Sequence, residues 1–383
     1  MTHIAIAGAG FSGAVLAQEL GRAGHRVDVF DTRPHVAGNC HTARDAASGV
    51  MLHTYGPHIF HTSDERVWDY IRKFGEFMPF VNRVKAITGG RVFSLPLNLL
   101  TINQFTGNTF SPAEAAAFFD DVGEKTEHAP ANFEEQALAL MGRKLYEAFF
   151  EGYTTKQWGM PPSALPASIL KRLPVRFNYD DNYYNSRFQG IPRDGYTAIV
   201  ENLLDLPNVE VHLGTHFERS QAADYDHVFC SGPIDAWFGH DAGRLGYRTL
   251  DFKREDHEGD HQGNAVINYC DASVPWTRIS EHKHFAPWEQ HSKTVTFKEY
   301  SRFCEPDDTP YYPIRLVAEK ALLAHYVERA RDERGVTFLG RLGTYRYIDM
   351  HVTIAEALDV ADCYRRSLRA QVPLPAFVVD PLA

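Results

Sequence analysis

Three glycines near the start of the chain have the type and spacing of a dinucleotide-binding turn. Gly8, Gly10 and Gly13 follow one apolar run, and a second apolar run ends at Asp31. In such a unit the first glycine permits a tight turn, the second lets the backbone approach a pyrophosphate, and the third lets a helix pack on a strand. Helix amides then bind phosphate, and Asp31 can accept hydrogen bonds from both ribose hydroxyls. Residues 1–31 are therefore predicted to bind a dinucleotide.

The choice between FAD and NAD depends on the residues after this unit. The chain has no second G-x-G-x-x-G pattern, which argues against a reductase with its own NADPH domain. Residues 32–39 contain another glycine turn, at Gly38, that could cross the cofactor. FAD is therefore favoured, and a glycine-rich turn without any ligand is the alternative.

Three later segments combine basic with aromatic residues: 151–159 followed by Lys171 and Arg172, 274–282, and 340–350. Guanidinium groups match diphosphate oxygens, and aromatic faces stack on bases and sugars. Taken singly, each tyrosine is more often a core residue and each arginine a surface charge. Composition alone cannot join these segments into one site.

Charge and composition exclude several other classes. The net charge of −10 argues against a nucleic-acid binder, and it means that an anionic ligand must be captured by local arginines. No apolar run is long enough to span a membrane and no secretory signal is seen, so we expect a cytoplasmic protein. The five cysteines form no CxxC pair and are expected to be reduced. His58 and His61 form an HxxH pair, but no third ligand lies at helpful spacing, so no metal site is predicted.

The elements that must position these residues are α/β at both ends of the chain and helical or antiparallel between. Helices are expected over 64–75, from Ser111 onward, over Asn132–Phe150, over 314–333 and over Thr353–Leu368. A hairpin is expected at Val84–Ile87 and Arg91–Leu95, with strands at Ile4–Ala7, Val209–Leu213, His227–Cys230, Val266–Tyr269, Lys293–Phe297 and Val336–Leu339. A chain of 383 residues suggests two or three domains, and the nucleotide domain is expected to be discontinuous in sequence.

Segments along nearly the whole chain match one family in its own order. They are GAGFSGAVLA, YGPHIFHTS, FVNRVKA, LPLNLLTINQ, FFEGYTTKQWG, LKRLPVR, SGPIDAWF, WTRISEH, PYYPI and GRLGTYRYIDM. On these segments the chain closely resembles the bacterial UDP-galactopyranose mutases, whereas a generic flavin oxidase would share only the first of them.

The resemblance implies an α/β fold in three parts. These are an FAD-binding Rossmann-like domain (1–80, 190–235 and 316–383), an inserted helical substrate-lid domain (98–180) and a twisted antiparallel β-sheet domain (81–97 and 236–315), with the active site in the cleft among them. It also implies an isomerase that interconverts UDP-galactopyranose and UDP-galactofuranose through a covalent adduct of the sugar with N5 of reduced FAD, without net redox. An external reductant such as NAD(P)H or a reductase, and a homodimer, are implied as partners.

Residue roles follow from the resemblance position by position. The implied catalytic residues are Arg172 and Arg278, which would clamp the diphosphate, and His58, beside the isoalloxazine. The implied substrate-binding residues are Asn82, Phe149, Tyr153, Thr154, Trp158, Arg172, Tyr183, Asn268, Arg278, Tyr312 and Tyr347. The implied cofactor-binding residues are Gly8, Gly10, Phe11, Ser12, Gly13, Asp31, Arg33, Gly38, Asn39, His58, Arg341, Tyr347, Asp349 and Met350.

Two residues depart from the family pattern. Ala37 stands where a second glycine is usual, which is tolerable unless that residue needs a positive φ. Asp31 stands where glutamate is common, so the ribose contact would be shorter or bridged by water. The alternatives to a mutase are a flavin-dependent oxidoreductase of the amine-oxidase kind and a catalytically silent nucleotide-binding scaffold.

Overall fold

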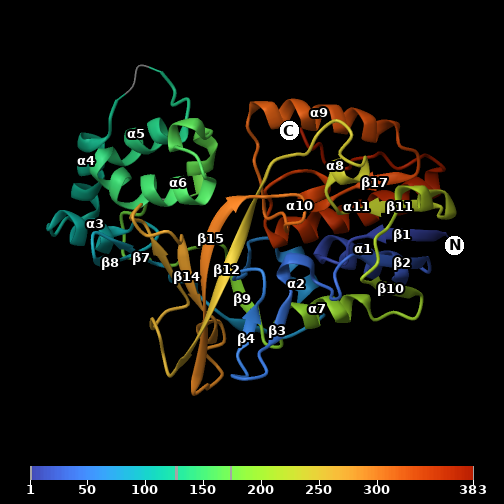
Figure 1. Cartoon of the computed structure of the whole chain (residues 1–383), viewed down its shortest axis with the longest axis horizontal. Helices are drawn as coiled ribbons and strands as arrows, with labels where there is room; N and C mark the ends of the chain where they lie inside the picture. The colour runs from blue at the N-terminus through green and yellow to red at the C-terminus, as the bar shows by residue number, and fades with distance from the viewer. Residues whose placement is uncertain (1, 126–127, 173–174, 383) are drawn as a thin grey trace.

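The structure, a computed structural model, describes residues 2–125, 128–172 and 175–382, without the side chains of residues 168, 171, 172, 317 and 318. Figure 1 shows a helical lobe on one side and an α/β part on the other, with two long strands between them. The fold is mixed α/β, as predicted, and contains both a parallel and a largely antiparallel sheet.

The α/β part is built on a five-stranded parallel sheet in the order β10-β2-β1-β11-β17. Its strands are β1 (His3–Ala7), β2 (Arg26–Asp31), β10 (Val209–Leu213), β11 (His227–Cys230) and β17 (Val336–Phe338). The chain leaves β1 toward β2 and β10, and later returns to the other side of β1 as β11 and β17. The strand order therefore reverses between β1 and β11, and ligands of such sheets bind at the carboxyl ends of the strands at this point.

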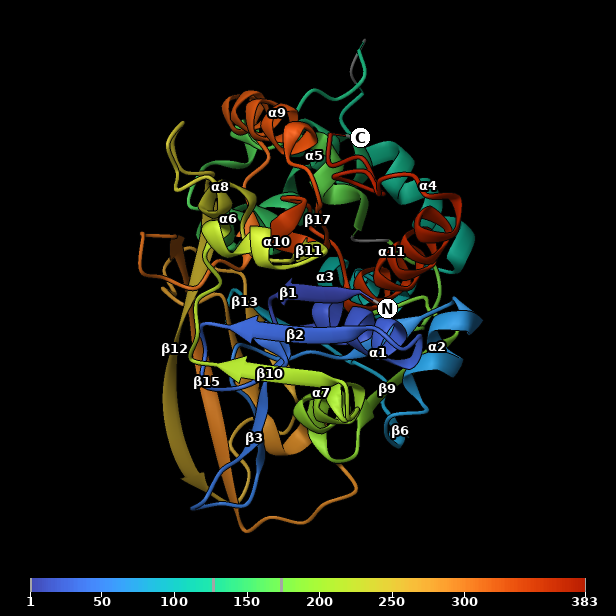
Figure 2. The ribbon, with the colours of Figure 1, turned by 90° about the vertical axis from the view of Figure 1, so that its right-hand side faces the viewer.

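Helices cover both faces of the parallel sheet, whose strands β1, β2 and β10 lie one above another in Figure 2. Ile4 and Ile6 of β1 pack in one core with helices α1 (Phe11–Arg22), α7 (Gly195–Leu204) and α11 (Met350–Ala370). Ala5, between them, packs in the opposite core with α8 (Ile234–Trp237) and α9 (Val317–Asp332). Burial on both faces explains the continuous apolar run of Ile4, Ala5 and Ile6 in the central strand β1.

The helical lobe comprises α3 (Leu99–Thr106), α4 (Pro112–Val122), α5 (Phe133–Tyr146) and α6 (Gly152–Trp158). Ser111 and Asn132 cap α4 and α5 as predicted. The single helix predicted over Asn132–Phe150 is wrong in detail, because Gly142 breaks α5 with φ 71° and ψ 167°. A π-helical turn, η2 (Glu147–Glu151), then leads into α6. Short 3₁₀ turns, η3 (Pro162–Ala164) and η4 (Ala167–Arg172), close the lobe.

The second sheet has seven strands in the order β16-β12-β15-β14-β13-β7-β8. They are β16 (Tyr312–Pro313), β12 (Tyr247–Glu258), β15 (Lys293–Phe303), β14 (Arg278–Glu281), β13 (Val266–Tyr269), β7 (Lys85–Thr88) and β8 (Arg91–Ser94). All neighbours are antiparallel except β13 and β7, which run parallel. The predicted hairpin of β7 and β8 is confirmed, whereas β15 extends six residues beyond the predicted strand end at Phe297.

Smaller elements fill the junction between the sheets. Two short sheets are formed by β3 (Thr42–Arg44) with β4 (Met51–His53), and by β5 (Phe60–Thr62), β9 (Phe188–Pro192) and β6 (Phe77–Pro79). The remaining helices are η1 (Gly38–Cys40), α2 (Glu65–Ile71), η5 (Arg219–Asp224), η6 (His282–Phe285) and α10 (Gly340–Gly343). Helix α2 ends four residues before Gly75, the predicted stop.

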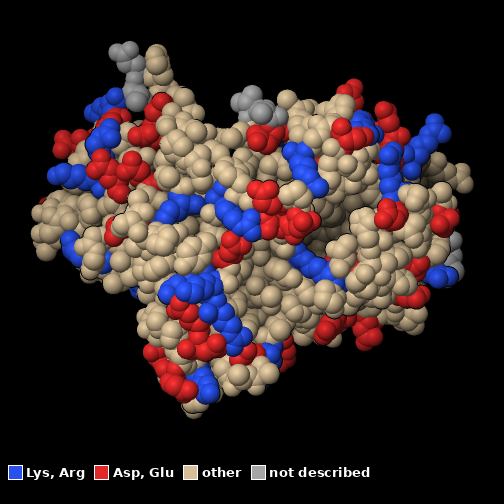
Figure 3. Space-filling view, in the orientation of Figure 1, with Lys and Arg blue, Asp and Glu red and all other residues tan. Residues whose placement is uncertain are grey.

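Acidic and basic side chains are interspersed among the coloured residues of the face shown in Figure 3. A continuous basic surface of the kind that binds nucleic acid is therefore not seen on that face. Within the described residues, every helix is too short or too polar to cross a membrane.

Two fully buried histidines at the junction make stability depend on pH. The backbone N–H of His53 donates to Nδ1 of His282 (3.1 Å). Burial lowers the pKa of His282 to about 3 and places the pKa of His53 well below its ordinary value. Below pH 6.5 the unfolded chain takes up protons that the folded chain excludes, so stability falls as the pH falls toward 4.

We expect His282→Gln to flatten this dependence. Each excluded proton contributes a slope of about 1.4 kcal/mol per pH unit between pH 6.5 and 4. Urea unfolding at pH 7, 6 and 5 measures the slope, and the exposed variant His216→Gln serves as the matched control. An unchanged slope in His282→Gln would show that this residue does not exclude the proton.

Candidate functional site

The glycine turn between β1 and α1 forms a cradle that leaves no room for a side chain at Gly8 or Gly13. Gly8 has φ +116°, and a Cβ there would lie 2.2 Å from Ser231 Oγ. A Cβ on Gly13 would lie 1.9 Å from the Gly8 carbonyl oxygen, so α1 is packed directly on the turn. Gly10 caps α1 without a side-chain hydrogen bond, which leaves the first amides of the helix to a ligand. Phe11 and Ser12 are the first residues of this helix and are buried.

A second glycine turn meets the first. A Cβ on Gly38 would lie 3.4 Å from the Cα of Gly10, so the two backbones face each other closely. Arg33 donates through Nη2 to Asn39 Oδ1 (2.8 Å), and its guanidinium lies 4.5 Å from the centre of the Tyr55 ring. Arg33 Nη1 is buried with no hydrogen-bond partner. A phosphate or another anion in this cradle would satisfy that donor, so the residues present fit a dinucleotide cofactor.

Asp31 holds the cradle together. Its two carboxylate oxygens each accept a backbone N–H, from Ala9 and from Arg33, both at 2.9 Å. Each oxygen can accept a further hydrogen bond, so the predicted ribose contact stays a prediction. On the other side, Arg341 donates to the carbonyls of Ile348 (2.6 Å) and Tyr311 (3.2 Å), which draws the start of α11 toward β16.

One rung of the antiparallel sheet carries the central charges of the site. Asn268 on β13 lies directly opposite Arg278 on β14, and Arg278 lies directly opposite Glu299 on β15. Arg278 Nε donates to Glu299 Oε1 at 2.7 Å, and Ser280 Oγ lies 3.3 Å from the same oxygen. Glu299 is 1% exposed, whereas the Arg278 side chain is 25% exposed. A guanidinium has five N–H donors, so donors remain on Arg278 for a ligand.

The charge of Arg278 organises the tyrosines around it. Burial is the largest single effect and opposes this charge, but the Glu299 carboxylate together with Tyr312 and Tyr153 outweighs burial and holds the pKa of Arg278 well above its ordinary value. Burial raises the pKa of Tyr312 to about 12 against the opposing effect of Arg278. The pKa values of Tyr153 and Tyr183 are also raised by burial, again opposed by Arg278. These hydroxyls therefore stay protonated at neutral pH and can donate hydrogen bonds.

Tyr347 closes this cluster on the side of the cofactor cradle. Its ring lies 5.4 Å from that of Tyr312, and the Arg341 guanidinium lies 4.9 Å from its centre. Arg278 and Tyr347 both contribute to the pKa of Tyr183. The predicted substrate and cofactor residues are thus continuous in space.

An apolar cavity of about 110 Å³ opens beside the tyrosines. Five predicted substrate residues line it from α6, η2 and neighbouring segments: Phe149, Tyr153, Thr154, Trp158 and Tyr183. Asn268 reaches it from the rung that carries Arg278. A cavity with aromatic walls and two side-chain amides, those of Gln157 and Asn268, suits a flat base with polar edges.

His58 lies between the cradle and the charged rung. Burial lowers its pKa to about 4, and the charges of Arg341 and Arg278 both act on it. The imidazole is therefore neutral at neutral pH. Its Nδ1 lies 2.8 Å from the Gly56 carbonyl oxygen, and its own carbonyl accepts the hydroxyl of Tyr196 at 3.0 Å.

His61 lies next to residues that are distant from it in the sequence. Its ring stacks on Tyr184 at 3.8 Å, and its Nδ1 lies 3.0 Å from Ser186 Oγ. One ligating atom each from His61, Asp349 and His351 lies within 4.8 Å of the others. Asp349 and His351 are far from His61 in the sequence, and the group does not include His58, so the prediction of no metal site stays a prediction.

The remaining predicted residues are less closely joined to the cluster. Asn82 is 4% exposed with its side-chain oxygen unpaired, and its carbonyl accepts the N–H of Tyr183 at 2.8 Å. Asp349 and Met350 begin α11, where Met350 packs against the core of the parallel sheet. Arg172 ends η4, and its side chain lies outside the described residues, so its predicted role stays a prediction.

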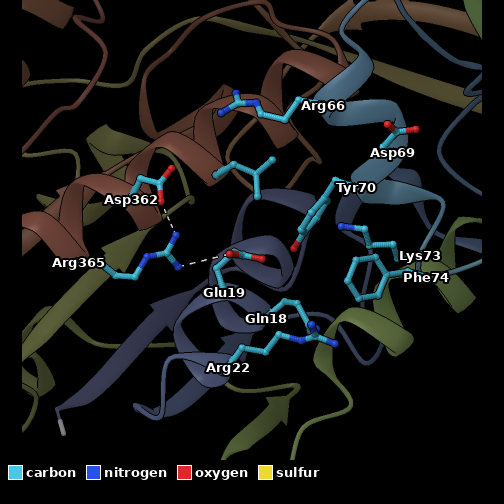
Figure 4. A pocket seen from close by; sticks show the side chains of 11 residues that line it. Gln18, Glu19, Arg22, Arg66, Asp69, Tyr70, Lys73, Phe74, Asp362 and Arg365 are labelled. Carbon is cyan, nitrogen blue, oxygen red and sulfur yellow. Dashed lines mark hydrogen bonds and ion pairs between the residues drawn. The ribbon is translucent and has the colours of Figure 1, made fainter.

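A larger hollow of about 450 Å³ lies elsewhere, between α1, α2 and α11 (Figure 4). Its charges are largely paired with one another or with neighbours. Arg365 binds Glu19 (3.3 Å) and Asp362, and Arg66 binds Asp359 (2.7 Å). None of the predicted site residues is among those that line it. The candidate site is therefore the smaller cavity with its charged rung.

Comparison with known proteins shows the family of the chain. A profile of UDP-galactopyranose mutase matches residues 148–347, and one of NAD(P)-binding Rossmann-like domains matches residues 6–74. A probable UDP-galactopyranose mutase of Klebsiella pneumoniae is 55% identical over 98% of both chains. The chain belongs to the UDP-galactopyranose mutase family. The resemblance seen in the sequence is confirmed, and with it the prediction of a mutase rather than an oxidase or a silent scaffold.

Two further matches are another mutase and a solved structure. The dTDP-fucopyranose mutase of Escherichia coli is 48% identical over 95% of this chain and 98% of its own. A crystal structure of a reduced UDP-galactopyranose mutase matches with a TM-score of 0.71 at 14% identity, covering 96% of both chains. This structural match confirms that the chain has the fold of the mutase family.

Glu299 is the residue of the site that sequence reasoning missed. It lies in a strand whose predicted end was Phe297. The role of a buried carboxylate can be recognised only from its ion-pair partner. The register that places Glu299 opposite Arg278 is not visible in the sequence. The apolar alternation of Val295 and Phe297 breaks at Glu299, so it gives no signal that would extend or pair the strand.

The backbone at position 37 has the left-handed conformation that favours the glycine usual in the family. Ala37 has φ 74° and ψ 1°, the left-handed region, and is 1% exposed. The condition under which the alanine would be strained is therefore met.

We expect Ala37→Gly to stabilise the protein by roughly 0.5–1 kcal/mol, because relief of left-handed strain exceeds the entropy that glycine adds to the unfolded chain. Urea unfolding of the holoprotein measures the change. Ala23→Gly is the matched control, because Ala23 is exposed with φ −76° and has no such strain to lose. That variant should be destabilised, and equal changes in both variants would contradict the explanation.

Proposed function

We propose that this chain interconverts UDP-galactopyranose and UDP-galactofuranose with reduced FAD as its cofactor. The proposal is supported above all by one arrangement: the Arg278–Glu299 pair lies between a dinucleotide cradle and an aromatic cavity. A nucleotide sugar has a flat base, a diphosphate and a sugar in that order. The cavity and the guanidinium offer groups complementary to the base and the diphosphate, and the sugar would then lie toward the flavin that the cradle would hold.

The side chains of the site would bind and orient the substrate. Tyr153 and Phe149 would hold the base in the cavity, with Asn268 as a polar contact. Arg278 would bind the diphosphate and stabilise the negative charge that develops when UDP leaves. Tyr312 and Tyr347 would donate hydrogen bonds to the phosphate or the sugar. Arg172 would complete the clamp from the helical lobe.

The cradle would hold FAD through the amides of α1, Arg33 and Asn39. When bound and reduced, the flavin would supply a nucleophilic nitrogen, N5, for covalent attachment of the sugar at its anomeric carbon. The chain's own part is to keep UDP near the sugar after it leaves and to exclude water. A neutral His58 beside the cradle adds no charge that would compete with Arg278 for the diphosphate. A cytoplasmic location, an external reductant and a homodimer belong to the same proposal.

The first test is conversion of UDP-galactofuranose to UDP-galactopyranose, followed by liquid chromatography. We expect turnover after reduction with dithionite, none with oxidised enzyme, and no reductant consumed per turnover. Arg278→Ala should lose about 100- to 1000-fold in turnover, the range seen for removal of one charge-stabilising donor. Its FAD content should be unchanged, and Arg278→Lys should retain part of the activity because it keeps the charge without the fork.

Arg26→Ala is the control, because Arg26 is exposed at the amino end of β2, away from the cradle. Wild-type turnover by Arg278→Ala would refute the role of that arginine. The same assay with a dTDP-fucofuranose separates the two substrates suggested by the relatives. Faster conversion of the dTDP sugar would overturn the assignment of UDP-galactose while leaving a mutase.

The covalent step has its own test. Treatment of reduced enzyme with borohydride during turnover should yield a conjugate of flavin and galactose, detected by mass spectrometry of the released cofactor. The conjugate should be absent when UDP replaces the nucleotide sugar. Active enzyme that gives no conjugate under these conditions would contradict covalent attachment.

A further inference from the structure

Lys156 makes an unusual set of contacts next to the proposed site. Its ammonium lies within hydrogen-bond distance of four backbone carbonyl oxygens, those of Tyr269 (2.7 Å), Asp271 (3.0 Å), Val274 (2.9 Å) and Trp276 (3.1 Å). Tyr269 is the last residue of β13, and the other three residues lie in the loop that joins β13 to β14. Three N–H donors are thus shared among four oxygens. A cage of backbone carbonyls is also how proteins replace the hydration shell of a monovalent cation.

The helix that carries Lys156 lies in direct contact with this loop. Gly152 is one turn earlier on the same face of α6. A Cβ on Gly152 would lie 2.4 Å from the Cys270 carbonyl oxygen and 2.9 Å from the Ala272 nitrogen. Helix and loop backbones therefore touch at Gly152, and the ammonium binds the loop one turn further along.

The far end of α6 is anchored to the same sheet. The carbonyl of Gln157 accepts hydrogen bonds from Arg248 Nε (3.1 Å) and from Ser301 Oγ (2.7 Å). Arg248 is 1% exposed, and burial lowers its pKa to about 10. These donors satisfy a carbonyl that the helix end leaves without an internal partner. The helix is thus held by cations at two places along its length.

These anchors connect two parts of the proposed site. Tyr153, the proposed base contact, lies three residues before Lys156 on α6. Arg278, the proposed diphosphate contact, lies two residues beyond the last carbonyl of the cage. The charge of Arg278 acts on the hydroxyl of Tyr153. The distance between these two groups therefore depends on how α6 is seated on the loop.

We infer that Lys156 is a positioning residue, a tethered cation whose carbonyl cage sets the spacing between the base-binding and diphosphate-binding halves of the site. The inference rests on the proposed function for the identity of the ligand. It goes beyond that function because Lys156 itself is assigned no contact with substrate. Its role is to hold Tyr153 and Arg278 at the spacing that lets both contact one nucleotide.

Removal of the ammonium should weaken binding and should be reversible. In Lys156→Ala holoenzyme we expect UDP to bind at least tenfold more weakly than to wild type by titration calorimetry, with FAD content unchanged. Ammonium chloride at 100 mM should restore at least fivefold of this loss by entering the cage. Tetramethylammonium chloride should restore none, because it has the same charge but no N–H donors. Lys144→Ala, on the exposed face of α5, should behave as wild type.

Hydrogen exchange supplies a readout that does not depend on UDP. The amides of Tyr269, Cys270 and Val274 bond to Thr277, Ile87 and Asp271. They should exchange at least tenfold faster in Lys156→Ala and slow again with ammonium. Should that variant not fold, Lys156→Met keeps the stem and should show the same losses without rescue.

The outcomes separate the two proposals. Failure of wild-type enzyme to bind UDP would refute the proposed function, while the exchange experiment would still test the cage. Wild-type affinity in Lys156→Ala, or a loss that ammonium and tetramethylammonium restore equally, would overturn the positioning role.

Discussion

The site depends on a guanidinium held against a buried carboxylate on the neighbouring strand. Removing two charges from water costs several kcal/mol per ion unless each meets a partner with good geometry. Arg278 and Glu299 meet this condition because they are directly opposite in an antiparallel register. The pair keeps a positive charge in a protein whose net charge is −10. Any slip of β14 against β15 would leave both charges unpaired. The charge of the site therefore depends on the register of the sheet.

The polar side chains next to this pair are uncharged at neutral pH, so they do not weaken the effect of the Arg278 charge. His58 is neutral, and the neighbouring tyrosines remain protonated because burial shifts their pKa values away from neutrality. The groups come from distant parts of the chain: the glycine turns from its start, the aromatic wall from the helical lobe and Tyr347 from near its end. In a cavity with few competing charges, electrostatic interactions with an anion are stronger than they would be in water.

The fold could be predicted where local pattern decides it, and the site only where a motif or a resemblance existed. The strands Val209–Leu213 and Val266–Tyr269 are predicted with their observed limits, because the first alternates apolar with polar residues, the second is mostly apolar, and each lies between turns. The full length of β12 is not, because its second half is exposed and rich in charge. The glycine cradle follows from spacing, whereas the roles of the arginines and tyrosines come from family resemblance. Glu299, and the meeting of His61 with Asp349, depend on contacts between distant segments that no local pattern contains.

The order of strands in the parallel sheet has a consequence for how the protein is made. β1 pairs with β11, more than two hundred residues later, and β17 completes the sheet close to the end of the chain. The first βα unit therefore emerges from the ribosome long before its neighbours exist, with one edge of β1 unpaired. Pairing across so long a loop is slow, and exposed strand edges invite association with other chains. During synthesis the helical lobe, whose contacts are mostly local, can assemble first, while the nucleotide-binding half must wait for the carboxyl-terminal segment.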